Sequence, residues 1–150
     1  MLLTHVSLDV TRAIQLALGP VFLLTGIAGL LNVMAGRLAR IIDRGRVLTE
    51  RPDGTALPEQ DWRHLELRNL DRRRHYTSVA ITSCTVAALL VCVVIASLFL
   101  EVLLDAPVIL WLTGALFTAA TLSLVVGLSF FLREVHLATR TIRIPTPGAP

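Results

Sequence analysis

The sequence contains no lysine, and it lacks the short motifs that mark the commonest catalytic and metal sites. Without lysine there is no phosphate-binding loop of the Gly-Lys-Ser or Gly-Lys-Thr kind. No His-Glu-x-x-His or Cys-x-x-Cys pattern occurs, the four histidines show no ligand spacing, and no serine lies in a nucleophile elbow. The sequence therefore favours a protein that is not an enzyme and that needs no metal ion or cofactor.

Cysteine is also scarce, with Cys84 and Cys92 eight residues apart in one apolar run. Eight residues of helix separate two Cα atoms by about 12 Å, whereas a disulfide requires less than about 7 Å. The spacing therefore favours a packing role for these side chains over a redox pair.

Charge is absent from three long stretches of the chain, residues 13–36, 76–100 and 106–132. Each exceeds the roughly 20 residues with which a helix crosses about 30 Å of hydrocarbon. Hydrophobic residues make up 54% of the chain, and the mean hydropathy is +0.70. We predict an all-α membrane protein with three transmembrane helices.

The arginines are distributed unevenly around these three stretches. Ten of the 14 basic residues lie between the first two stretches and three follow the last one, whereas only Arg12 precedes the first. The link between the second and third stretches carries Glu101 and Asp105 and no arginine. Because cytoplasmic segments are enriched in basic residues, we expect a bacterial inner-membrane protein with its N-terminus outside and its C-terminus in the cytoplasm.

Between the first two spans the chain keeps a helical pattern. Leu38, Ile41 and Leu48 recur at helical spacing, and a Pro-Asp-Gly turn at 52–54 precedes a second helix that continues into the second span. This pattern predicts a cytoplasmic helical hairpin over about residues 37–75. Residues 1–143 would form a single membrane domain, and the proline-rich residues 144–150 a disordered tail.

Small residues recur at every fourth position in the second and third spans. The second-span ladder is Ala80, Cys84, Ala88, Cys92 and Ala96, and the third-span ladder is Ala115, Ala119, Ser123 and Gly127. Small residues at this spacing let helix backbones approach closely in a membrane. We expect the ladders to be packing seams, either between these two spans or between subunits.

The first span carries a mixed stripe of small, polar and aromatic residues on one side of its helical wheel. This first-span stripe comprises Gln15, Gly19, Phe22, Gly26, Gly29, Val33, Gly36 and Arg40. One interpretation is a packing face against the other spans or a neighbouring subunit. The other is the lining of a pore, in which Phe22 and Val33 are constrictions and Arg40 is a ring at the inner mouth. A pore requires a homo-oligomer, because three helices cannot enclose one.

Charged residues of the first and third helices meet the inner edge of the membrane at one level. This inner-edge cluster comprises Arg37, Arg40, Asp43, Arg44, Arg133 and Glu134. We expect Glu134 to pair with an arginine of the first helix, and Asp43 with one of the first or third. A clamp between helices is favoured over a substrate site.

Three blocks of sequence carry a resemblance to a known family: AIQLALGPVFLLTGIAGLLNVMAGRLARIIDRGR, LELRNLDRRRHY and FFLREVHLA. They are similar to a family of small bacterial membrane proteins catalogued only as a domain of unknown function. The resemblance spans about residues 8–140 and implies a three-span bacterial membrane protein, without an established activity or cofactor.

The arginines flank membrane spans, where anionic lipid headgroups attract basic residues, and seven acids lie among the ten arginines of the link. We therefore expect an anionic membrane surface, and not nucleic acid, as their partner. The overall expectation is a homo-oligomer. Packing is favoured over a pore for the first-span stripe, and a channel lined by the first span is the most concrete activity that the sequence offers. The alternative is an accessory or scaffold protein whose arginine-rich hairpin binds a cytoplasmic partner.

Overall fold

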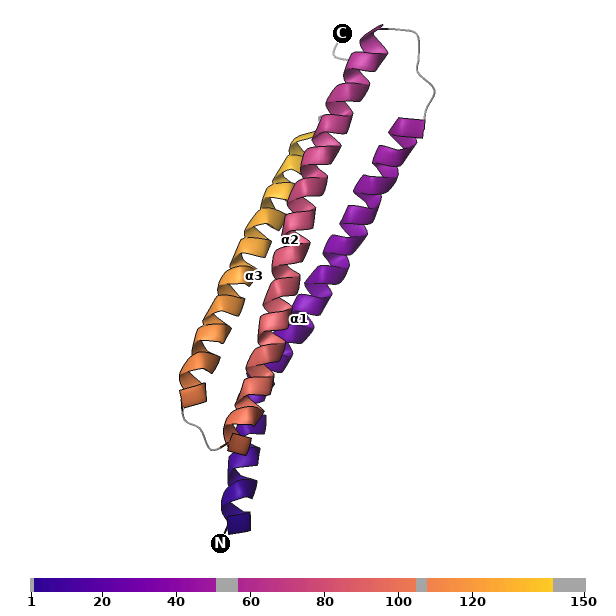
Figure 1. The fold of residues 1–150 in the computed structure, drawn as a ribbon. Helices are drawn as coiled ribbons and strands as arrows, with labels where there is room; N and C mark the ends of the chain where they lie inside the picture. Colours follow the sequence, from indigo (N-terminus) through magenta and orange to yellow (C-terminus); the bar gives the residue numbers. More distant parts are fainter. Residues whose placement is uncertain (1, 51–56, 105–107, 142–150) are drawn as a thin grey trace, which may run out of the picture.

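The computed structural model describes the backbone of residues 2–50, 57–104 and 108–141 and the side chains of residues 10–50, 64–104 and 110–139. Over these residues the chain is entirely α-helical, with α1 (Leu2–Glu50), α2 (Leu57–Leu104) and α3 (Val108–Thr141). The three helices run antiparallel, so that the end of α1, the start of α2 and the end of α3 lie at the same end of the molecule (Figure 1). The turn predicted at 52–54 and the tail predicted over 144–150 lie outside the described residues.

Each helix contains a segment long and apolar enough to cross a membrane, with mean hydropathies of 2.0, 2.8 and 2.1. Large apolar side chains face outward along them, as Phe22, Leu103 and Trp111 do with 73%, 79% and 79% of their surface exposed. Such surfaces are unfavourable in water and compatible with lipid. The predicted all-α chain with three apolar helices is confirmed, and these helices indicate a multi-pass membrane protein.

The helices extend well beyond the uncharged stretches. α1 passes through Pro20 without a break and continues to Glu50, and α2 begins at Leu57, 19 residues before the uncharged stretch at 76. A proline within a membrane helix is tolerated when neighbouring groups accommodate the carbonyl that loses its hydrogen-bond donor. Both helices therefore carry long arginine-rich segments at the same end of the molecule.

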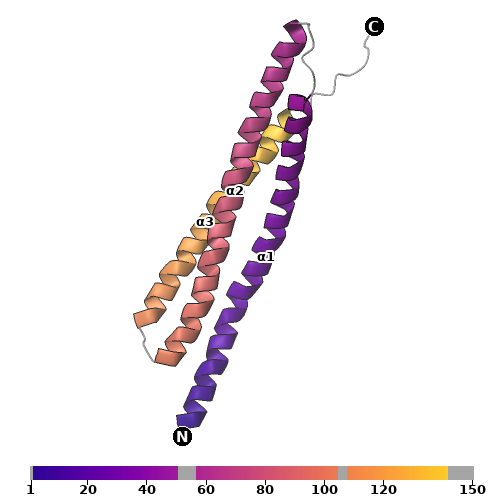
Figure 2. The same cartoon turned by 45° about the vertical axis from the view of Figure 1, so that its right-hand side comes forward.

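The central helix is α2, which packs against both α1 and α3 and has its larger contact with α3. In Figure 1 α1 and α3 lie on different sides of α2, and in Figure 2 the end of α3 passes behind α2 to the side of α1. The apolar core is formed by residues such as Ile27, Met34 and Val91.

The core positions follow a seven-residue repeat in all three helices. The positions of this repeat are all buried or half-buried. They are residues 13, 17, 20, 24, 27, 31, 34, 38, 41, 45 and 48 in α1, residues 70, 73, 77, 80, 84, 87, 91, 94, 98 and 101 in α2, and residues 113, 116, 120, 123, 127, 130, 134 and 137 in α3. Alternating steps of three and four residues keep one face of a helix towards its neighbour along a left-handed supercoil. This repeat determines which side chains meet.

The contact between α2 and α3 is close at Gly127. A Cβ atom at this position would lie 2.7 Å from Cys84 Sγ and 3.1 Å from the carbonyl oxygen of Ala80. Two hydroxyl contacts lie along the same interface: Ser123 donates to the carbonyl of Ser83 at 2.9 Å, and Ser97 Oγ lies 2.8 Å from Thr113 Oγ1. These contacts join α2 and α3 within their apolar segments.

Candidate functional site

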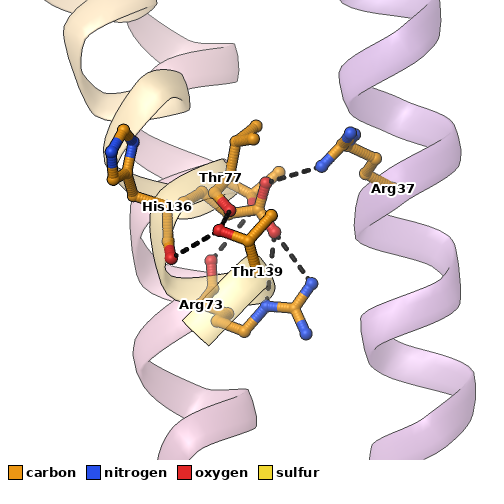
Figure 3. Close-up of polar contacts among 7 residues, drawn as sticks. Arg37, Arg73, Thr77, His136 and Thr139 are labelled. Carbon is orange, nitrogen blue, oxygen red and sulfur yellow. Dashed lines mark hydrogen bonds and ion pairs between the residues drawn. The ribbon is translucent and has the colours of Figure 1, made fainter. Parts of the chain in front are cut away.

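A fully buried glutamate joins all three helices at the arginine-rich end. Glu134 of α3 has no exposed surface, although its side chain is charged. Its Oε1 accepts hydrogen bonds from Arg73 Nη2 at 2.9 Å and Arg73 Nε at 3.3 Å, and its Oε2 accepts one from Arg37 Nη1 at 3.3 Å. Figure 3 shows Arg37 on α1 and Arg73 on α2 directed towards this carboxylate. We call these three residues the arginine-glutamate clamp.

The seven-residue repeat explains why these side chains converge. Glu134 occupies a core position of α3, seven residues after Gly127, and Arg73 occupies a core position of α2, seven residues before Ala80. Arg37 lies beside the core position Leu38 and directly after the uncharged stretch of α1. The clamp therefore continues the apolar seam at the point where the chain becomes charged.

Neighbouring groups hold the clamp in place. The guanidinium carbon of Arg37 lies 5.4 Å from the ring centre of Phe131, which is an attractive cation-π geometry. Thr77 is fully buried, and its hydroxyl donates to the carbonyl of Arg73 at 2.9 Å. Arg73 Nε and Nη2 both donate to one carboxylate oxygen, and charge-assisted hydrogen bonds are the strong ones. The clamp thus fixes the register of α1, α2 and α3.

A buried carboxylate of this kind is strongly destabilising when it is unpaired, and it requires well-placed partners. Both oxygens of Glu134 are hydrogen-bonded, and the two arginine side chains remain 39% and 26% exposed. The arginines can therefore stay partly hydrated while they neutralise the glutamate. This arrangement is that of a structural clamp, because each carboxylate oxygen accepts at least one hydrogen bond from an arginine of another helix.

The structure separates the predicted inner-edge cluster into three parts. Glu134 was expected to pair with an arginine of the first helix, and it pairs with Arg37 of α1. Arg44 pairs with Glu66 of α2 at 3.0 Å. Arg40, Asp43 and Arg133 are exposed and form no ion pair with any described residue. The expected partner for Asp43 is thus absent from the described part of the chain.

Sequence reasoning missed Arg73, the closest partner of Glu134. In the sequence nothing distinguishes Arg73 from the other arginines of the link, because its neighbours Arg72 and Arg74 are arginines as well. The signal that identifies it is the seven-residue repeat, since position 73 continues the series of core positions 80, 87 and 94.

The first-span stripe faces away from α2 and α3, except for its last residue, Arg40, which lines a pocket together with residues of α2. All eight of its residues are exposed, and no heavy atom beyond the helix itself lies within 4 Å of where a Cβ would stand at Gly19, Gly26, Gly29 or Gly36. The interpretation of the stripe as a face packed against the other two spans is therefore wrong. Alanine and larger apolar residues of the seven-residue repeat, such as Ala17, Ile27 and Met34, form the packing face of α1 instead.

The two small-residue ladders are only partly in the interface. Ala80, Cys84 and Gly127 are buried and Ala88 and Ser123 are half-buried, whereas Cys92, Ala96, Ala115 and Ala119 are exposed. A step of four residues rotates the side chain by roughly 40° around the helix, so a four-residue ladder leaves the interface after two or three steps. The ladders therefore do not form seams between the second and third spans over their whole length, and a contact between subunits through their exposed residues stays a prediction.

The described residues contain no cluster of side chains that would hold a metal ion. No three His, Cys, Asp or Glu side chains among them gather as a metal site would require. Cys84 is buried in the α2–α3 contact and Cys92 is exposed, and both are free thiols. The clamp is therefore the most organised polar arrangement that the described residues contain.

Comparison with known proteins places the chain in a family. No curated protein and no solved structure matches it. One family model matches residues 17–144, which include α2, α3, the clamp and α1 from residue 17 onwards. The chain belongs to the family described as "Protein of unknown function (DUF2721)".

Proposed function

We propose that the chain is a membrane protein without enzymatic activity that works as a homo-oligomer, assembled through the first-span stripe, and that the α1 helices of this oligomer line a channel. The observation that carries the proposal is the exposure of the whole stripe. Four glycines on it have no neighbouring heavy atom within 4 Å of the place that a Cβ atom would occupy. In a membrane, exposed glycine lets a second backbone approach closely, and this contact drives association where lipid does not.

The order of residues along the stripe supports the channel. Gln15 lies near one end and Arg40 near the other, and Phe22 and Val33 between them are 73% and 54% exposed. Around a common axis, polar groups would face the two mouths and the apolar side chains would form constrictions that gate by excluding water. Gln15 is exposed in the single chain, where an apolar residue would suit lipid better.

The proposed orientation follows from the arginines. All but Arg12 among the described arginines lie at the end where α1 ends, α2 starts and α3 ends. By the preference of basic residues for the cytoplasm, this end would be cytoplasmic, with the N-terminus outside a bacterial inner membrane. The segments of α1 and α2 beyond the uncharged stretches would then form the cytoplasmic hairpin.

The test is the oligomeric state of the full chain in nanodiscs or liposomes. Gly29→Leu should reduce an oligomer to monomers, because leucine prevents the close approach of two α1 helices. The matched control is Gly114→Leu, since Gly114 is also exposed and also has nothing within 4 Å of its Cβ position. A monomeric wild type, or equal effects of both substitutions, would overturn the proposed assembly.

The channel has its own measurement in liposomes loaded with a reporter of ion flux. The exposed Phe22 occupies a proposed constriction, so Phe22→Ala should increase the flux of an intact oligomer. Phe117→Ala is the control, because Phe117 is an exposed phenylalanine of α3 outside the stripe. An oligomer in which Phe22→Ala and wild type conduct no ions would leave assembly standing and overturn the channel.

A second candidate function, an accessory protein with a cytoplasmic partner, rests on a groove between α1 and α2. A cavity of about 440 Å³ lies beyond the uncharged stretches, with Ile41, Leu67 and Leu70 among its lining residues. Ile42, another lining residue, is 48% exposed, which is unfavourable if this region lies in water. An amphipathic helix of a partner would cover such a surface.

Cross-linking in native membranes tests this second function. Ile42→Ser together with Leu67→Ser, two lining residues, should abolish capture of one defined partner at unchanged protein level. Arg68→Gln is the control, because Arg68 is an exposed residue of the same segment of α2. Capture that persists in the double variant would exclude this surface as the docking site.

A further inference from the structure

A pocket with four arginines lies between α1 and α2 at the arginine-rich end. Its volume is about 300 Å³. The lining residues are Arg37, Arg40, Ile41, Arg44, Leu70 and Arg73. We call it the four-arginine pocket, and no carboxylate is among its lining residues.

The positive charges of this pocket exceed the negative charges that compensate them. Glu134 is shared by Arg37 and Arg73, and Glu66 pairs with Arg44. Arg40 has no ion-pair partner among the described residues. Four guanidinium groups therefore face two carboxylates, which leaves an excess of two positive charges around one cavity.

The other acids of this region do not line the pocket. Asp43 is exposed on α1, and Asp71 of α2 is exposed and lines two neighbouring cavities instead. Because opposite charges attract, an anion that enters the pocket would be attracted by all four arginines. The pocket thus has the charge of an anion site.

The form of the side chains favours an oxyanion such as a phosphate group. The guanidinium of arginine is a planar fork of N–H donors that matches two oxygens of a phosphate. The clamp already holds Arg37 and Arg73 in place by their bonds to Glu134, so part of the donor set is ordered before a ligand arrives. Phosphate can enter here as an inorganic ion or as part of a lipid headgroup.

The position of the pocket along the helices favours a lipid headgroup over inorganic phosphate as the ligand. Arg37 directly follows residue 36, where the uncharged stretch of α1 ends, and Arg73 lies three residues before residue 76, where that of α2 starts. The pocket therefore lies at the border of the proposed hydrocarbon layer, where phospholipid phosphates lie. Basic pockets between membrane helices at the cytoplasmic side are suited to anionic headgroups.

We infer that the four-arginine pocket binds the phosphate group of an anionic phospholipid between α1 and α2. The site is formed within one chain, so it does not depend on the proposed oligomer or channel. In this site Arg40, which is not part of the clamp, contacts the lipid phosphate directly. A bound lipid would also bridge α1 and α2 where the clamp joins them to α3.

The experiment measures lipid retained by the full chain in native mass spectrometry and the affinity for a short-chain phosphatidylglycerol in detergent. The wild type should retain one phosphatidylglycerol per chain in preference to phosphatidylcholine. Arg40→Gln and Arg44→Gln should each weaken binding about tenfold, as expected for the loss of charge-assisted hydrogen bonds. Arg40→Lys should fall between wild type and Arg40→Gln, because lysine keeps the charge and lacks the fork.

The matched control is Arg133→Gln. Arg133 is an exposed arginine of α3 that lines a separate cavity between α2 and α3, which also contains Arg72 and His136. The affinity of the Arg133→Gln variant for phosphatidylglycerol should stay close to that of the wild type. Equal weakening by Arg133→Gln and Arg40→Gln would show a general attraction to basic charge and overturn the site, and weakening by Arg133→Gln alone would move it to the other cavity.

Inorganic phosphate distinguishes the two sources of the ligand. Phosphate should displace the lipid only at concentrations far above those at which phosphatidylglycerol binds, because it gains nothing from the surrounding membrane. If phosphate binds as tightly as the lipid, with the same dependence on Arg40, the assignment to a lipid is wrong.

Discussion

Within the apolar segments, the contact of α2 with α3 contains small residues and hydroxyl groups, whereas the contact of α2 with α1 is apolar. The ion pair between α1 and α2 lies near the arginine-rich end. On one side, Gly127 lies against Cys84 and Ser97 against Thr113. On the other, Ile27 and Met34 pack in the core, and Arg44 pairs with Glu66 beyond the uncharged stretch.

This difference matters because lipid provides little hydrophobic drive for helices to associate. Close backbone approach and hydrogen bonds between helices therefore determine which helices stay together in a membrane. The pair of α2 and α3 has both, and α1 is joined to it at one end by ion pairs with Glu134 and Glu66. We expect α2 and α3 to behave as a unit and α1 to be the helix that adjusts in the proposed oligomer.

The largest expected effect comes from the clamp, which joins the two sides of this comparison. Glu134→Gln should reduce the free energy of unfolding by about 3 kcal/mol, because two arginines lose the buried charge that compensates them. Titration of micelles with sodium dodecyl sulfate would measure the loss. Asp43→Asn is the control, since Asp43 is exposed and forms no ion pair with a described residue. Equal stabilities of the two variants would show that the clamp contributes nothing.

A smaller effect is expected at the close contact of α2 and α3. Gly127→Ala should destabilise the chain by roughly 1–3 kcal/mol, because the new methyl group meets Cys84 Sγ and the backbone of Ala80. The same measurement on Gly114→Ala should show no loss, since that position is open and alanine favours helix over glycine.

The double variant sharpens the result for Gly127. Replacing Cys84 by alanine as well removes the sulfur and leaves the backbone contact, so stability should recover in part. Full stability of Gly127→Ala alone would mean that α2 and α3 are not held as closely as the structure indicates.

The smallest effect separates the two kinds of polar contact. Double-mutant cycles for Ser97 with Thr113 and for Arg44 with Glu66 should each give a coupling of about 0.5 kcal/mol. Salt should weaken the coupling of Arg44 with Glu66, whose side chains are 54% and 23% exposed, and should leave that of the buried hydroxyl pair unchanged. A hydroxyl coupling that falls with salt would contradict the assignment of this pair to a buried, uncharged contact.

Much of the secondary structure could be predicted, because it depends on local properties of the chain. Three uncharged stretches predict three helices, and the partner of Glu134 on the first helix is expected from its depth. The face of α1 that packs against the other helices is harder to predict from the sequence. Its glycine stripe suggests a packing face, although Ala17, Ile27 and Met34 form the contact.

Side-chain size alone could not identify the interfaces. Small residues suit close packing wherever they lie, so Ala80 and Ala96 look equivalent in the sequence, yet only Ala80 is buried. Arg73 is hard to recognise for a related reason, because it is one of three consecutive arginines and only its angular position distinguishes it from Arg72 and Arg74.

By itself, the sequence determined that this chain forms three long apolar helices with arginines at one end, because length, hydropathy and charge act along the chain. Only the tertiary structure decided which faces meet. Helices that pack over many turns follow a seven-residue repeat, and this geometry turns Glu134 and Arg73 inward and the first-span stripe outward.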